Sequence, residues 1–94
     1  MPVLRIEHDV PDFDGWKEAF DSDPVDRKGS GVRRYGVFRS LEDPNHVMID
    51  LEFDSTGEAE ALLATMRNVW RRVEGRVMNN PQASIVELVD RKNY

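Results

Sequence analysis

The sequence predicts an α+β fold in which two helices cover one face of a four-stranded antiparallel sheet. Three observations carry this prediction. Four segments alternate apolar and polar residues as strands do, and two segments repeat apolar residues at helical spacing. These segments follow one another in the order β-α-β-β-α-β. The longer helical segment gives the clearest signal.

The first strand is predicted over Val3–Val10, where apolar and polar side chains alternate. One side is polar after its first residue, and the other carries Leu4, Ile6, His8 and Val10. Pro11 ends the strand, and Asp12 is placed to cap a helix in which Phe13, Trp16 and Phe20 share a face. Asp23-Pro24 interrupts this helix and predicts a second, short helical start, with Asp23 as its cap.

A hairpin is predicted next. Its first strand spans Val32–Ser40, and Gly36 weakens that strand or marks a bulge. Asp43–His46 fits a type I turn with proline at its second position. The following strand, Val47–Phe53, has the strongest alternation, with one apolar face formed by Val47, Ile49, Leu51 and Phe53.

The second helix is predicted from Ser55 to about Met78. At about 100° per residue, one arc of some 120° collects its apolar residues, which are Ala59, Leu62, Leu63, Met66, Val69, Trp70, Val73 and Val77. Ser55 and Glu58 form a capping box at its start. Asn79-Asn80-Pro81 is expected to stop the helix, unless Gly75 ends it sooner. A fourth strand is predicted over Ala83–Val89.

This order predicts two right-handed crossovers around a central hairpin, which is the split βαβ or ferredoxin-like sandwich. The first and third strands should be central, with both helices on one face. The other face would carry opposite charges on neighbouring strands, which can pair across the sheet. Its residues are Arg5, Glu7, Met48, Asp50 and Glu52.

The amino-acid composition disfavours several classes of binding partner and excludes sites that need cysteine. Ninety-four residues make one domain with a thin core, so a partner subunit would help to stabilise it. The net charge of −5 disfavours nucleic acid and anionic membranes as partners. The absence of cysteine excludes disulfides, thiolate metal sites and a cysteine nucleophile. No signal-peptide pattern and no membrane-length apolar run is present, so a soluble cytoplasmic protein is expected.

Four stretches resemble the dimeric α/β-barrel superfamily: VPDFDGWKEAFD, the GV before the second strand, FRSLEDPNHVMI and VWRRVEG. Within that superfamily the chain is similar to small proteins grouped near the antibiotic-biosynthesis monooxygenases. The resemblance implies a homodimer in which the uncovered faces of two sheets form a barrel. It also implies a ligand pocket between sheet and helices in each subunit.

Two functions found among proteins of this fold, haem degradation and acylphosphatase activity, are disfavoured. Haem-degrading members use an asparagine on the first strand, whereas this chain offers Glu7 and His8 there. Those members also use a haem-ligating histidine on a later helix, and no histidine follows His46. The acylphosphatase branch needs a Gly-rich anion-binding loop after the first strand, where this chain has the acidic VPDFDG. No cofactor is therefore expected.

His8 is the main catalytic candidate, because alternation places it on the helix-facing side of a central strand near its end. A histidine there can accept a substrate proton. The alternative is a structural role, in which His8 lies at the edge of the core and forms a hydrogen bond with the backbone. A small set of side chains is the candidate ligand-binding wall, although core packing is the favoured explanation for the tryptophans and an edge-strand role for the tyrosine. These are Trp16, Tyr35, Met66 and Trp70.

A metal site has little support, since His46 and Asp50 would lie some 13 Å apart along a strand. Two functions stay open. One is a cofactor-independent oxygenase, or a related isomerase or cyclase, that acts on a small aromatic compound with His8 as the base. The other is a non-catalytic homodimer that binds a small apolar or aromatic ligand or serves as a structural subunit.

Overall fold

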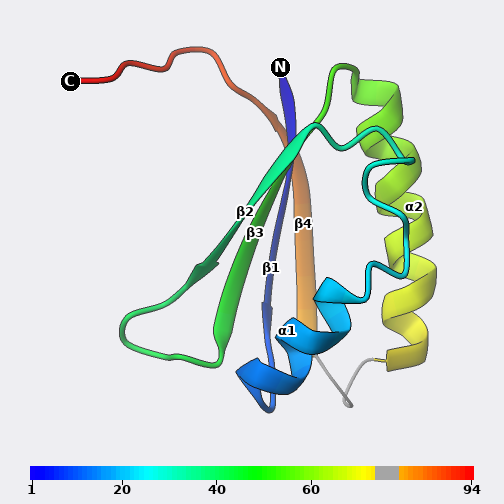
Figure 1. The fold of residues 1–94 in the computed structure, drawn as a ribbon, viewed down its shortest axis with the longest axis vertical. Helices are drawn as coiled ribbons and strands as arrows, with labels where there is room; N and C mark the ends of the chain where they lie inside the picture. The colour runs from blue at the N-terminus through cyan, green and yellow to red at the C-terminus, as the bar shows by residue number, and fades with distance from the viewer. Residues whose placement is uncertain (74–78) are drawn as a thin grey trace.

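A computed structural model describes residues 1–73 and 79–94, and its six elements follow in the predicted order (Figure 1). They are β1 (Pro2–Asp9), α1 (Phe13–Asp21), β2 (Arg34–Arg39), β3 (His46–Glu52), α2 (Thr56–Val73) and β4 (Asn79–Glu87). All strand pairs are antiparallel, in the order β2-β3-β1-β4. The predicted ferredoxin-like class is therefore confirmed, with β1 and β3 central.

The strand register sorts the side chains onto two faces. Ile6 pairs with Ile49 on the helix-facing side, and Arg5 pairs with Asp50 on the opposite side. Figure 1 shows α2 running along the sheet. We call the opposite side the outer face; its residues are Val3, Arg5, Glu7, Asp9, Arg34, Gly36, Phe38, His46, Met48, Asp50, Glu52, Gln82, Ser84 and Val86.

The core lies between the helices and the sheet. Burying each large aliphatic side chain there contributes about 1.5–3 kcal/mol, which holds the two layers together. Strand residues supply one side of this core, namely Leu4, Ile6, Val47, Ile49 and Leu51. The helices supply the other side with Trp16, Ala59, Leu62, Leu63 and Trp70.

Both helices begin at the predicted caps. The backbone N–H of Gly15 donates to the Asp12 carboxylate at 3.0 Å at the start of α1. At the start of α2 the N–H of Glu58 donates to Ser55 Oγ at 3.2 Å. The Ser55 hydroxyl in turn donates to the Glu58 carboxylate at 3.0 Å, so the two side chains hold each other. The predicted β-turn over Asp43–His46 is also present, since the His46 N–H donates to the Asp43 carbonyl.

The second helical start predicted at Asp23-Pro24 is wrong. Residues 22–31 form successive turns instead, and Asp23 has a positive φ of 56° that breaks the helical path. The Asp23 carboxylate does accept a backbone N–H, that of Arg27 at 2.9 Å, but it closes a turn and not a helix. This turn region packs over one end of the core and reaches the site described below.

The fourth strand begins earlier than predicted. Asn79-Asn80-Pro81, expected to stop the helix, lies inside β4, and the strand ends at Glu87 instead of Val89. Asn80 has φ of 52° next to a register shift against β1, so a bulge accommodates it. Pro81 is tolerated because β4 is an edge strand. The predicted helix end at Gly75 or Met78 lies outside the described residues.

Among the described residues, neither helix combines the length and the apolar character needed to cross a membrane.

Candidate functional site

A cavity of about 290 Å³ lies between the two helices and the sheet. Side chains from β1, β3, α1, α2 and the turns after α1 form its wall, so both helices and both central strands contribute to it. Most of the wall is apolar, as in typical small-molecule pockets. The lining residues are Ile6, His8, Trp16, Ala19, Phe20, Ser22, Pro24, Val25, Arg27, Ile49, Met66, Val69 and Trp70.

His8 is the polar group buried most deeply in this wall, with 1% of its surface exposed. Its ring meets Trp16 edge to face, with 5.4 Å between centroids. Within the described part of the chain, neither ring nitrogen makes a hydrogen bond of good geometry, and only the backbone of Asp9 interacts weakly with the ring. Burial lowers the pKa of His8, and the adjacent Asp9 opposes that shift only in part. The imidazole is therefore neutral at pH 7 and has a lone pair to offer a ligand.

The aromatic side chains of α1 continue the wall from His8. Trp16 lies 5.2 Å from Phe20 between ring centroids, in a tilted arrangement. Met66 and Trp70 join the same cavity from α2. Four of the five predicted site residues thus come together: His8, Trp16, Met66 and Trp70.

Tyr35 does not join them. It lies on the edge strand β2 opposite Leu51 and is 48% exposed. Its ring meets Phe20 edge to face, with 5.3 Å between centroids, so Tyr35 touches the wall from outside the cavity. The guanidinium of Arg27 lies 3.9 Å from the Phe20 ring centroid and 4.9 Å from that of Tyr35. Tyr35 lines a neighbouring surface hollow, to which Arg27 and Asp23 also contribute. An edge-strand position explains this, because the cavity lies under the two central strands.

Arg27 is a charged residue of the wall that the sequence did not predict as part of a site. It stands in the turns between α1 and β2, where the sequence predicted a helix start and gave no reason to look for a ligand contact. Its side chain is only 12% exposed. Periodicity carries no information about a side chain in irregular structure, so only the folded chain reveals this position.

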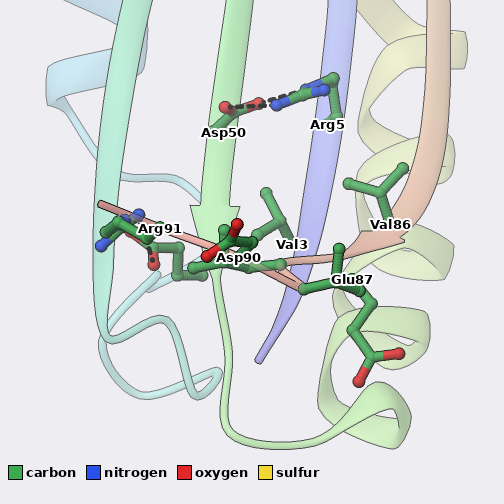
Figure 2. Close-up of a pocket in the computed structure, with 10 residues that line it drawn as sticks. Val3, Arg5, Asp50, Val86, Glu87, Asp90 and Arg91 are labelled. Atoms are coloured by element: carbon green, nitrogen blue, oxygen red, sulfur yellow. Dashed lines mark hydrogen bonds and ion pairs between the residues drawn. The ribbon is translucent and has the colours of Figure 1, made fainter.

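A second hollow, of about 320 Å³, lies on the outer face (Figure 2). Arg5 and Asp50 meet there through two hydrogen bonds of 2.9 and 3.1 Å, which confirms the predicted cross-strand pairing. In Figure 2 the segment carrying Asp90 and Arg91 passes across the other end of this hollow. Arg91 approaches Glu52 at 3.7 Å. Both arginines of this hollow thus face carboxylates, and its lining is more polar than that of the helix-side cavity, which is the better fit for an apolar ligand.

His46 also lies on the outer face, in surroundings opposite to those of His8. Its two ring nitrogens contact Asp9 at 2.7 Å and Glu7 at 2.6 Å. Hydrogen bonds to Asp9 and then to Glu7 raise the pKa of His46. Among the described residues no group of three or more histidine and acidic side chains is arranged to hold a metal ion.

No protein-family model and no curated protein matches the chain, but solved structures do. An antibiotic biosynthesis monooxygenase superposes with a TM-score of 0.71 at 12% identity, covering 96% of this chain and 100% of that one. SnoaB, a cofactor-independent oxygenase from Streptomyces nogalater, gives 0.74 at 9% identity, with 96% and 94% covered. This chain has the fold of these monooxygenase-like proteins.

A dimeric ferredoxin-like protein from an uncultured marine organism is similar as well, with a TM-score of 0.66, 13% identity and 97% of each chain covered. At identities this low the likeness establishes the ferredoxin-like fold of this chain. The chemistry has to be argued from the chain's own cavity.

Proposed function

We propose that this protein is a homodimeric, cofactor-independent oxygenase that acts on a small aromatic compound in the cavity between helices and sheet. The proposal rests on the burial of His8 in an aromatic wall, where neither of its ring nitrogens makes a hydrogen bond of good geometry to the described residues. Leaving a buried polar group unpaired costs about 1–3 kcal/mol. A hydroxyl group of a bound ligand would remove that penalty by donating a hydrogen bond to the ring nitrogen. The ring nitrogen of His8 is therefore the expected polar contact of the ligand.

The chemistry follows from the state of this imidazole. Its lowered pKa keeps it neutral, so it can accept the proton of an acidic hydroxyl or activated C–H group. The substrate anion that forms is electron-rich and reduces O₂ directly. One oxygen atom then enters the substrate, and the other leaves as water with two hydrogens of the substrate, both from the reacting carbon of an anthrone, or from the reacting carbon and a hydroxyl group of a quinol. The substrate supplies all the electrons, so no cofactor is needed.

The outer face supports the homodimer. It is uncovered by helices, and Phe38 on it is 52% exposed. Packing two such faces together would bury this ring and extend a core that 94 residues keep thin. Comparable solved proteins are described as dimeric, which agrees with this arrangement.

A non-catalytic small-molecule carrier is the second candidate. It is favoured by the wall itself, where His8 is the one group with a suitable pKa and the remaining side chains are mostly apolar. Such a site binds an aromatic ligand without needing to transform it. The two functions differ in whether oxygen is consumed.

The test measures oxygen uptake with a reduced quinol and with anthrone, in chelator-treated buffer without added flavin. Wild-type turnover is expected, and His8→Ala should reduce it by roughly 10²- to 10⁴-fold, the usual contribution of a positioned base. His46→Ala is the matched control, because this second histidine lies outside the cavity. Circular dichroism must show both variants folded. Full activity in a folded His8→Ala variant would remove His8 from the mechanism, and absence of wild-type turnover would favour the carrier.

A further inference from the structure

We infer that the cavity selects an aromatic ligand that carries a carboxylate, and that Arg27 is the residue that recognises this acidic group. The inference rests on the proposed function only in that it uses the same cavity. It adds the chemical class of the ligand and a residue that determines specificity.

Arg27 is held rigidly at the cavity wall. Its Nη1 donates a 2.8 Å hydrogen bond to the carbonyl of Phe20, which lies seven residues earlier at the end of α1. Its guanidinium lies against the faces of Phe20 and Tyr35, with 3.9 and 4.9 Å to their centroids. These contacts fix the plane of the guanidinium before any ligand arrives, so less side-chain freedom is lost on binding.

The fixed guanidinium keeps donors for a ligand. It carries five N–H groups, and the structure uses Nη1 for the Phe20 carbonyl and brings Nε to 3.5 Å from the Asp23 carboxylate. Nη2 donates no hydrogen bond to a protein acceptor within residues 1–73 and 79–94. Asp23 is the nearest acidic partner and is not part of the cavity wall.

Among the described residues, Arg27 is also the one fully charged side chain in the wall. The remaining lining is apolar or aromatic apart from Ser22 and the neutral His8. In the described part of the chain no carboxylate lines the cavity, and the Asp23 carboxylate beside Nε lies outside it, so an anion at the wall meets the positive charge of Arg27. Surroundings of low polarity strengthen such an ion pair relative to the same pair in water.

Two polar groups thus stand at opposite ends of an aromatic wall. His8 contacts Trp16, Trp16 contacts Phe20, and Phe20 lies under the guanidinium of Arg27. A flat ring system stacks on such a wall, with a hydroxyl group at the histidine end and a carboxylate at the arginine end. A cavity of about 290 Å³ suits a ligand of one or two rings.

The contacts of Arg27 with Phe20 and Asp23 also anchor the turns after α1, and the experiment separates this structural role from ligand recognition. Binding of 6-hydroxy-2-naphthoate, its methyl ester and 2-naphthol is measured by calorimetry and by the fluorescence of the tryptophans in the wall. Wild-type protein should bind the acid about 10- to 100-fold more tightly than the ester, as expected for a hydrogen bond to a charged group. Arg27→Gln should bring the acid to the affinity of the ester and leave the ester unchanged.

Arg33→Gln is the matched control, because Arg33 pairs with Asp54 away from the cavity and should retain the wild-type preference. Arg27→Lys keeps the charge without the planar fork and should retain part of the preference, even where Arg27→Gln weakens the turns. Equal wild-type affinity for acid and ester would overturn the inference and leave the cavity as an aromatic site. Failure of all three compounds to bind folded wild-type protein would overturn both this inference and the proposed aromatic ligand.

Discussion

At the scale of single residues, the two histidines show how neighbouring positions acquire opposite chemistry. His8 and His46 lie on adjacent central strands, where His8 pairs with Val47 and His46 with Asp9. One ring points into the core and has no polar partner, whereas the other points to the outer face between two carboxylates. Burial lowers the first pKa, and charge-assisted hydrogen bonds raise the second.

These opposite shifts predict opposite effects of pH on stability. The folded pKa of His46 lies above its unfolded value of 6.5, so its stabilisation is fully present below pH 6.5 and is lost as pH rises through the folded pKa. The folded pKa of His8 lies below the same value, so His8 begins to destabilise the fold as pH falls below 6.5.

Urea unfolding of wild type, His46→Gln and His8→Gln at a series of pH values checks this. The stability advantage of wild type over His46→Gln should shrink between about pH 6 and pH 9. Relative to His8→Gln, wild type should lose stability as pH is lowered from about 7 to 5. Parallel pH profiles for all three proteins would contradict the assigned environments.

At the scale of elements, the start of α2 is defined by one local pair. Ser55 Oγ accepts the N–H of Glu58 and donates to the Glu58 carboxylate. The same carboxylate lies against Gly31, whose φ of 101° favours glycine and whose Cβ, if present, would be 2.4 Å from Glu58 Oε2. The cap therefore also fixes how the turns before β2 meet the helix.

Ser55→Ala is expected to lower the free energy of unfolding by about 1 kcal/mol, because the N–H of Glu58 loses its acceptor. The midpoint of urea denaturation should fall while the slope stays constant. Thr65→Ala, an exposed position in the middle of α2, is the control and should change stability little. An unchanged midpoint for Ser55→Ala would mean that the cap contributes nothing to stability.

At the scale of the whole molecule, the helices cover one face of the sheet and leave the other face uncovered. The helix side holds the core and the cavity, and the outer face holds ion pairs such as Arg5–Asp50 beside exposed Phe38. A short chain with one uncovered sheet face gains stability from a second copy, which is why a dimer is expected.

Light scattering at micromolar concentration should give twice the 10.9 kDa mass of one chain. Ser84→Lys tests which face is used, since Ser84 is exposed on the outer face of a single subunit beside Arg5. A lysine there would be buried without a partner in the dimer and should yield the mass of one folded chain. Thr65→Lys, on the exposed side of α2, should remain dimeric. A Ser84→Lys variant that remains dimeric would place the interface elsewhere.

Local patterns in the sequence determine most of the fold. Alternation in β1 and β3 assigned Ile6, Ile49 and His8 to the helix side, because strand periodicity depends only on neighbouring residues. The caps at Asp12 and Ser55 were equally predictable, since a helix end needs an acceptor for its free N–H groups within a few residues. The same patterns brought His8, Trp16, Met66 and Trp70 to one side of the sheet.

Only the tertiary structure decided what lies outside such patterns. Asn79-Asn80-Pro81 has the local character of a helix stop, yet pairing with β1 and a bulge at Asn80 make it part of a strand. Tyr35 lies on the helix-facing side of its strand, as the cavity residues of β1 and β3 do. Its strand β2 is at the edge of the sheet, however, and strand order cannot be derived from periodicity. Arg27 reaches the cavity through irregular turns that contact Phe20 and Tyr35, and a side chain in irregular structure leaves no periodic signal in the sequence.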